Sequence, residues 1–292
     1  MLHRSLWLSL AFLYASSPLA AQHSRLTARQ VVERIQSKLG GDWSSGVDTF
    51  KDSDPDTPIT GVAVTMMSTM DVLQRAADAG LNLIITHEPT FYSHQDQLTT
   101  LEGEHDAVTA AKRAFIKEHH LVVFRLHDHW HYPQRNPDPV VAGVFRALGW
   151  DHYGRAAGEL PIVVLPETTT VAQLAAQVRA RLGVRALRVV GDSLMRVTRA
   201  GFAPGFPGFQ LQRQLLQRDE LEVLVMGEAH EWETIEYAAD AVAQGKRKAL
   251  IIVGHVPSEA AGSDELVRWL TPLLPELRVT HIPTAEPFWT PR

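Results

Sequence analysis

The chain has 292 residues, enough for one large domain or for two smaller ones that each bury a hydrophobic core. Apolar residues make up 45% of the sequence and charged residues 21%, which is typical of a globular protein and excludes a disordered or fibrous one. The net charge of -5, with no long lysine or arginine run, argues against a nucleic-acid partner. Cysteine is absent, which excludes disulfides, thiolate zinc sites and cysteine nucleophiles.

The first 21 residues have the pattern of a secretory signal peptide. Arg4 precedes an apolar run over residues 6–15, and small residues follow up to Ala20 and Ala21, after which we expect cleavage. A run of about ten apolar residues cannot span a bilayer. We therefore expect a periplasmic or secreted protein that has no membrane anchor after leader cleavage. The alternative is a retained anchor or a buried N-terminal helix.

Beyond the leader, helical and strand patterns alternate. Thr27 and Gln30 have capping-box spacing at the start of a first helix that ends at Gly40. Short apolar runs, typical of buried strands, then alternate with amphipathic helical segments. The patterns predict strands at or near residues 59–65, 81–86, 121–126, 161–165, 187, 197, 223–226, 249–253 and 279, and further helices over 69–79, 107–118, 140–148, 171–182, 232–243 and 264–274.

This alternation predicts an α/β fold with two lobes of β-sheet flanked by helices. Residues 24–150 together with 218–292 are expected to form the main lobe, and residues 151–217 a smaller α/β lobe. The glycine-rich segment 201–208 is interpreted as a tight turn because it lacks the spacing of a nucleotide-binding loop. Three large aromatic residues near these elements are interpreted as core or interface residues rather than pocket walls: Trp130, Trp150 and Trp232.

Residues with metal-binding side chains directly follow four of the predicted strands. Ligands of open α/β sheets bind beyond the carboxyl ends of the strands, and a divalent ion needs several imidazoles or carboxylates to converge there. A lone histidine is more often a hydrogen-bonded surface or core residue, whereas four strand ends together indicate a site. The candidates are His87, Glu88, His127, Asp128, His129, His131, Glu228 and His255.

Two groups among these residues have informative spacing. His255 and Glu259 are four residues apart at a strand-to-helix turn, which can place both side chains on one side of the helix start. An extended backbone would place His127, His129 and His131 on one side, where one of them could be an outer-shell partner instead of a ligand. A polar loop at the lobe boundary is the alternative interpretation of this run.

Five segments then follow one another in a specific order: residues 60–64 (TGVAV), residues 79–91 (AGLNLIITHEPTF), the His127 segment, Gly227 and Glu228 with their helix, and residues 254–259 (GHVPSE) running into residues 266–270 (LVRWL). Through them the chain resembles the Nif-three-like dinuclear-metal hexamer family, also named the GTP cyclohydrolase I type 2 family. The resemblance covers most of the mature chain. It implies a homohexamer with two divalent metal ions per chain, of zinc, manganese or iron.

Two of the family's five ligand positions differ here. The first strand-end motif normally has two adjacent histidines, at the positions of His87 and Glu88. The middle motif normally has a histidine and, four residues later, an aspartate ligand, at the positions of His127 and His131. The resemblance therefore implies the ligands His87, Glu88, His131, His255 and Glu259, with His127, Asp128 and His129 as additional ligands or outer-shell partners.

The two departures conserve the total charge of the ligands, because one adds a negative charge and the other removes one. This indicates a rearranged site rather than a decayed one, since decay would tend to leave apolar residues. If Asp128 instead of His131 takes the place of the family's aspartate, the site is more anionic.

From these residues we expect metal-assisted hydrolysis of an unknown small molecule, with Glu228 or His129 transferring protons. Activity on GTP is disfavoured because the leader directs the protein to a place where GTP is scarce. The alternative from another class is a non-catalytic scaffold or metal-binding protein whose ions join the lobes of an oligomer. A mononuclear histidine-rich hydrolase of another fold ranks last, because it gives no role to the pairs at 87–88 and 255–259.

Overall fold

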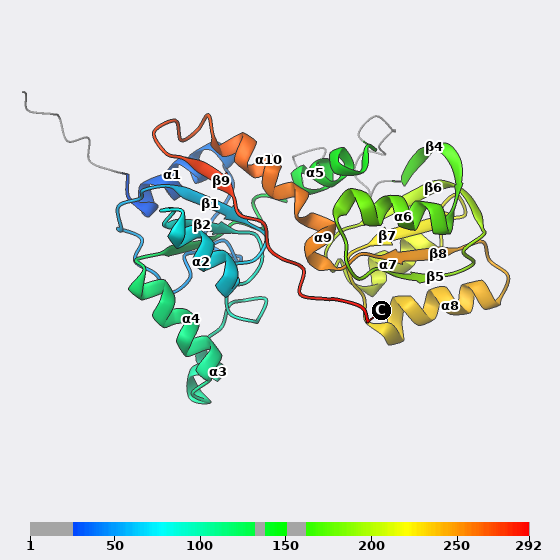
Figure 1. Ribbon diagram of the computed structural model, residues 1–292, viewed down its shortest axis with the longest axis horizontal. Helices are drawn as coiled ribbons and strands as arrows, with labels where there is room; N and C mark the ends of the chain where they lie inside the picture. Colours follow the sequence, from blue (N-terminus) through cyan, green and yellow to red (C-terminus); the bar gives the residue numbers. More distant parts are fainter. Residues whose placement is uncertain (1–25, 132–137, 151–161, 292) are drawn as a thin grey trace, which may run out of the picture.

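Two β-sheets organise the molecule, a computed structural model that describes residues 26–131, 138–150 and 162–291 (Figure 1). The expected signal peptide, residues 1–21, lies outside these residues. Among the described helices, none combines the length and the apolar character needed to cross a membrane.

The first lobe is built on a four-stranded parallel sheet in the order β3-β2-β1-β9. The strands are β1 (Val62–Thr65), β2 (Leu83–Thr86), β3 (Val122–Arg125) and β9 (Val279–His281). The residues of β1, β2 and β3 are all buried. Nearly continuous apolar runs of this kind are typical of parallel sheets that helices cover on both faces.

Two hydrophobic clusters cover the two faces of this sheet. Alternate strand residues such as Val62 and Leu83 pack with α1 and α10, whereas Ala63 and Ile84 pack with α2 and α4. The predicted capping box of Thr27 and Gln30 is present at α1. The helices of this lobe are α1 (Ala28–Leu39), α2 (Met70–Asp78), α3 (Thr99–Gly103), α4 (Ala107–Glu118) and α10 (Ala261–Leu270).

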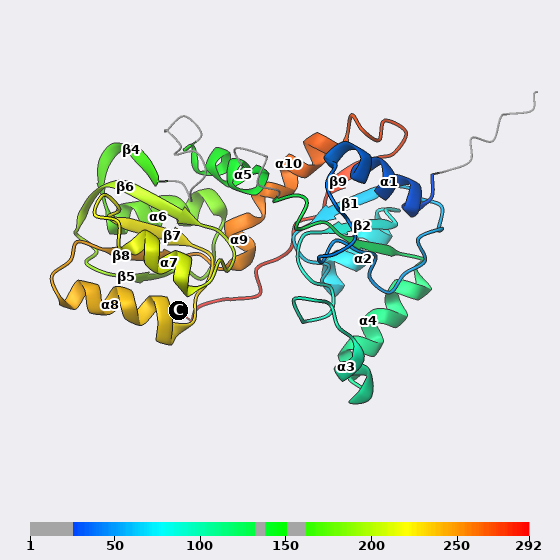
Figure 2. The same cartoon turned by 180° about the vertical axis from the view of Figure 1, so that it is seen from behind.

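The second lobe contains a five-stranded mixed sheet in the order β4-β6-β7-β8-β5, drawn on the left of Figure 2. The three central strands are parallel, and the two edge strands pair antiparallel to them. The strands are β4 (Ile162–Thr170), β5 (Arg188–Val190), β6 (Arg196–Ala203), β7 (Val223–Met226) and β8 (Ala249–Ile252).

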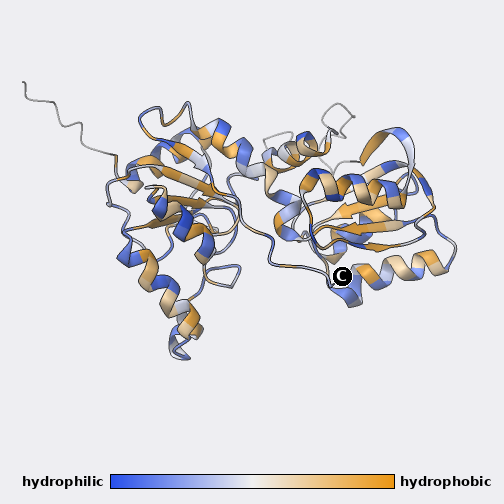
Figure 3. Ribbon diagram, in the orientation of Figure 1, coloured by the Kyte–Doolittle hydropathy of each residue, from blue (hydrophilic) through white to orange (hydrophobic). Residues whose placement is uncertain are grey.

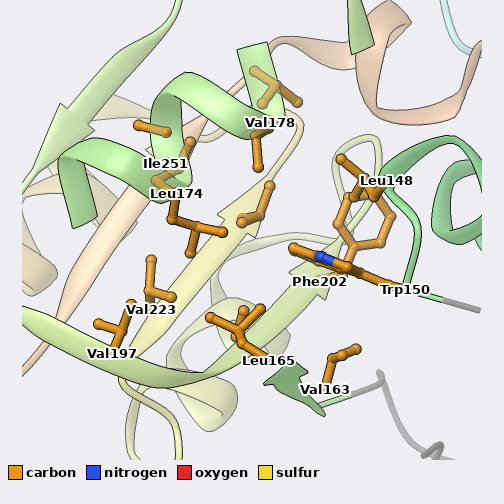
Figure 4. Close-up of a cluster of buried hydrophobic side chains, with 14 of the residues drawn as sticks. Leu148, Trp150, Val163, Leu165, Leu174, Val178, Val197, Phe202, Val223 and Ile251 are labelled. Carbon is orange, nitrogen blue, oxygen red and sulfur yellow. The ribbon is translucent and has the colours of Figure 1, made fainter. Parts of the chain in front are cut away.

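Alternation along the central strands sorts apolar side chains to the two faces of this sheet. Val223 faces a cluster with α5 and α6, part of which is drawn in Figure 4, whereas Leu224 faces α7 and α8. Figure 3 shows the same sorting, with hydrophobic strands inside and mixed helices outside. The helices are α5 (Pro139–Leu148), α6 (Val171–Leu182), α7 (Phe209–Leu216), a π-helical turn η1 (Glu231–Ile235), α8 (Glu236–Ala243) and α9 (His255–Glu259).

The sheet pairing corrects one expected grouping. Residues 218–292 were expected to join the main lobe, but β7 and β8 hydrogen-bond to β6 and β5 of the second sheet. The physical reason is that a short buried apolar run fits the centre of either sheet, and only long-range pairing decides between them. The chain returns to the first lobe after β8, through α9 and α10 (Figures 1 and 2).

Helices α5 and α10 join the lobes by a close crossing. A Cβ on Gly143 would collide with the Ala261 carbonyl, and one on Gly262 would lie 2.8 Å from the Val140 Cα. Val140 packs in a core cluster of the first lobe, and Val144 in one of the second. Because glycine is present at the contact, the two helices approach closely, and the pair packs in the hydrophobic cores of both lobes.

Candidate metal centre

The predicted strand-end residues converge at the junction of the two lobes. His87 and Glu88 follow β2, and His127 follows β3, all in the first lobe. His255 begins α9, which follows β8 of the second lobe. The Nε2 atom of His255 lies 3.2 Å from Oε1 of Glu88, so the carboxyl ends of parallel strands from both sheets meet at one place.

Four histidines present their Nε2 atoms to this junction because their Nδ1 atoms already donate hydrogen bonds. Nδ1 of His87 donates to the Leu126 carbonyl at 3.2 Å. The other three donate to carboxylates at 2.7–3.0 Å: His127 to Asp128, His131 to Asp138, and His255 to Glu228. A second-nitrogen bond of this kind fixes the ring and leaves a lone pair on the facing nitrogen, as in metal-bound histidines.

The facing atoms form a continuous cluster of donors. Nε2 of His87 lies 2.9 Å from Nε2 of His131, and Oε2 of Glu259 lies 3.8 Å from His87 and 3.4 Å from His255. Oε1 of Glu88 lies 3.6 Å from Nε2 of His127. Two groups of three residues could each hold a metal ion, because their ligand atoms lie within 4.8 Å of one another. The first group is His87, His127 and His131, and the second is His87, Glu88 and Glu259.

The cluster requires positive charge. Two imidazole lone pairs do not approach to 2.9 Å unless a proton or a metal ion lies with them. Oε2 of Glu259 is buried and has no hydrogen-bond partner among the residues that the structure describes, although burial of a charged oxygen is costly without compensation. Both features fit a donor set built for cations.

The histidine pKa values agree with this requirement. Burial lowers the pKa of His87 well below its usual value, and the positive charges of His131 and His127 add to this. Burial also opposes protonation of His131 and His255, but neighbouring carboxylates outweigh it and raise both pKa values, that of His255 to about 12. In the metal-free protein, protons on His131 and His255 therefore supply the positive charge that compensates the carboxylates.

Arg125 is a residue of this site that sequence patterns did not reveal. Its side chain is fully buried at the end of β3 and donates to Oε2 of Glu88 at 3.2 Å and to the His87 carbonyl at 3.0 Å. It leaves Oε1 of Glu88 facing His255. Arg125 therefore orients the glutamate that stands where the family has a histidine. A charged residue inside the apolar run 121–126 was the available signal.

Asp138 is the second missed residue, and it belongs to the start of α5. Its Oδ1 caps that helix by accepting from the Val140 amide, and its Oδ2 accepts from His131. The signal was an aspartate before Pro139, a helix-start pattern, seven residues after a candidate ligand.

The run 127–131 is a turn rather than an extended segment, because the His131 amide donates to the His127 carbonyl. His129 therefore points away from the other two histidines. Its Nδ1 lies 2.8 Å from an Asp48 carboxylate oxygen, its Nε2 lies 3.1 Å from the Asp42 carbonyl, and its ring stacks on Trp43 at 3.5 Å.

Asp128 supports the cluster from outside. Its Oδ1 accepts from His127, and its Oδ2 accepts from the Val47 amide. The structure thus brings His131, and not Asp128, to the facing donors. Glu228 likewise lies behind His255, with a half-exposed side chain that accepts from Nδ1.

Comparisons with known proteins identify the family of this arrangement. The family described as Duf34/NIF3 (NGG1p interacting factor 3) matches residues 31–287, nearly the whole described chain. No curated protein gives a significant match.

Several solved structures share the fold. Protein SA1388 of Staphylococcus aureus is 16% identical, with a TM-score of 0.68, over 91% of this chain and 99% of its own. A NIF3-related protein of Bacillus cereus is 13% identical, with a TM-score of 0.69, over the same shares. Reduced HcgD of Methanocaldococcus jannaschii is 12% identical, with a TM-score of 0.60, over 88% of this chain and 97% of its own. The resemblance seen in the sequence is confirmed, and the chain belongs to the Duf34/NIF3 family.

Proposed function

We propose that this protein binds two divalent metal ions at the lobe junction and is a metal-dependent hydrolase of a small molecule. The observation that carries the proposal is the convergence of four Nε2 atoms, each with its Nδ1 bonded elsewhere, on two buried carboxylates. Nitrogen and oxygen donors in this mixture suit zinc, manganese or iron.

The donors divide naturally between two ions, because one imidazole nitrogen binds one ion. His87 and His131 would hold the first ion, and His255 and Glu88 the second. Glu259 lies beside both His87 and His255, so its carboxylate would help to hold either ion. His127, between His87 and Glu88, would complete the set.

When bound, such ions would activate water and polarise an electrophile. The residues of this chain would hold the protons in place. Glu228 keeps a proton on Nδ1 of His255, so that the lone pair of Nε2 would be available to a metal ion. The half-exposed carboxylate of Glu228 can exchange protons with solvent. Asp128 and Asp138 hold the corresponding protons of His127 and His131.

The proposal includes location and assembly. The leader-like residues 1–21 support export to the periplasm or the exterior, and the family resemblance supports a homohexamer. Cleavage after Ala20 or Ala21, detected by mass spectrometry of the protein purified from a periplasmic fraction, tests the first part.

Metal counting tests the binding itself. We expect two zinc ions per chain by inductively coupled plasma mass spectrometry, falling to one or none in His255→Ala and in His131→Ala. His119→Gln changes an exposed histidine at the end of α4 and should keep both ions. A wild-type protein that holds no metal after zinc loading and gel filtration contradicts the proposal.

A metal-joined scaffold is the second candidate, and one observation favours it: the donors come from both lobes. Ions there would tie the lobes together whether or not they catalyse a reaction. Chelation separates the two functions. Loss of the oligomer on chelation, with no turnover of phosphoester, amide or cyclic-amidine substrates by the loaded protein, supports the scaffold over the enzyme.

A further inference from the structure

Three aromatic side chains contact one another near the candidate metal centre, and two of them are stacked. The rings of His230 and Trp232 are nearly parallel, with centroids 4.7 Å apart, and the Phe206 ring lies 5.0 Å from His230. We call Phe206, His230 and Trp232 the aromatic platform. Trp232 is 74% exposed and Phe206 is 41% exposed, whereas Trp130 and Trp150 are buried. The expected core or interface role thus fits the two buried tryptophans but leaves Trp232 uncovered in this chain.

The platform borders the proposed donors directly. A Cβ on Gly205 would collide with Oε1 of Glu259 and lie 3.1 Å from Nε2 of His255, so Gly205 lies close beside both donors. Phe206 is the next residue along the chain. On the adjacent strand end, Glu228 contacts His255, and His230 follows two residues later.

Buried hydrogen bonds hold the platform in place. The side chain of Gln212 donates to the Glu228 carbonyl at 2.9 Å and accepts from the Thr234 hydroxyl. Gln212 and Thr234 are both fully buried, and Thr234 belongs to the π-helical turn that carries Trp232. Short π-helical turns are rare and are frequent at functional sites.

The charges around the platform favour one class of ligand. Residues 228–245 contain no lysine or arginine and five carboxylates, those of Glu228, Glu231, Glu233, Glu236 and Asp240. Arg188 pairs with Glu231, and Glu233 accepts from His230. Such an acidic rim repels phosphate groups, whereas a cation over an indole face is attracted to it.

We infer that the aromatic platform binds a planar nitrogen heterocycle, neutral or cationic, and directs its reactive group to the junction of the lobes. The role in a reaction rests on the proposed function, but ring binding does not. A second copy of this chain over Trp232 is the other occupant to test.

Isothermal titration with two matched probes tests this inference on the zinc-loaded mature protein. The probe 1-methylnicotinamide is a cationic aromatic ring, and 1-methylpiperidine-3-carboxamide is its saturated counterpart, also cationic at neutral pH. Because both probes are cations, the difference between them measures ring stacking, and we expect the aromatic probe to bind about fivefold more tightly or better. Trp232→Leu should abolish this preference, and Trp232→Phe should restore part of it. Trp289→Leu, which removes a tryptophan that is 69% exposed in the C-terminal segment, should leave it unchanged.

Equal affinity for the two probes in the wild type, or a preference that survives in Trp232→Leu, overturns the inference. A second combination of results also overturns the inference: the wild type binds neither probe, and light scattering shows a lower oligomeric mass for Trp232→Leu. These results would assign the aromatic platform to contact with a second copy of the chain. Zinc content is measured on the same samples. If protein that retains no zinc still prefers the aromatic probe, the metal function is contradicted while the ring-binding site is supported.

Discussion

At the scale of single residues, the site depends on which nitrogen of each histidine faces the junction. The donors themselves could be predicted, because His87 and His255 directly follow apolar strands. The groups that orient them could only partly be predicted. Asp128 and Glu228 were already candidates, but Arg125 was hidden within a strand. The different orientation of His129 followed from a turn that the sequence did not reveal.

Arg125→Met should be the most disruptive single change near the site. It removes one of the two cationic partners of the buried Glu88 carboxylate, the other being His255, and leaves the His87 carbonyl without this donor. We expect a loss of about 3–5 kcal/mol in the free energy of unfolding of the metal-free protein, measured by urea denaturation.

The double variant Arg125→Met/Glu88→Gln is the control for this effect. Removing the charge of Glu88 should recover part of the lost stability, so the two changes should not be additive. Additive effects would mean that Arg125 does not act through Glu88.

Lys112 provides a pH-dependent effect outside the donor cluster. Burial, only partly opposed by Asp96, lowers its pKa from 10.5 to about 8, and its ammonium donates to the Thr90 carbonyl. Between these two values the unfolded chain binds more protons than the folded one, so stability should rise with pH. Relative to Lys112→Met, wild-type stability should increase by on the order of 3 kcal/mol from pH 8 to 10.5.

Urea unfolding at several pH values measures this difference. Lys38→Met, at an exposed site on α1, reports the general effect of removing a lysine. If the difference in unfolding free energy between wild type and Lys112→Met stays constant over this pH range, the lowered pKa of Lys112 is contradicted.

At the scale of elements, helices with clear caps were predicted best. The bounds predicted for 107–118 and 171–182 are those of α4 and α6, and both helices have side-chain caps. By contrast, α7 was missed: it has no side-chain cap and begins directly after the glycine-rich segment expected to be a turn. That segment also supplies the end of β6, because pairing with β7 extends the strand to Ala203.

The crossing of α5 and α10 leads to a prediction about glycine. Gly143→Ala places a methyl group against the Ala261 carbonyl, and we expect the protein to lose about 1–3 kcal/mol of unfolding free energy. Gly103→Ala is the matched change, since an added Cβ at that position in α3 meets nothing within 4 Å. It should be neutral or stabilising by about 0.5–1 kcal/mol, as helix propensity predicts. Equal effects of the two changes in thermal denaturation would show that the close crossing is unimportant.

At the scale of the whole molecule, the α/β fold and its two lobes were predicted, but the division of strands between sheets was not. Local patterns identify a buried strand such as 223–226 and do not show its neighbours. The consequence for function is direct. Because β8 belongs to the second sheet, His255 and Glu259 reach the first lobe across the junction, and any ion bound there contacts both lobes.

Anomalous diffraction from zinc-loaded crystals would show whether donors from both lobes share metal ions. We expect two peaks at the lobe junction. One should lie about 2.0–2.1 Å from Nε2 of His87 and His131 and beside the Glu259 carboxylate of the second lobe. The other should lie at about that distance from Nε2 of His255 and beside the Glu88 carboxylate of the first lobe. No peak at the junction, or zinc bound by the residues of one lobe only, would contradict this expectation.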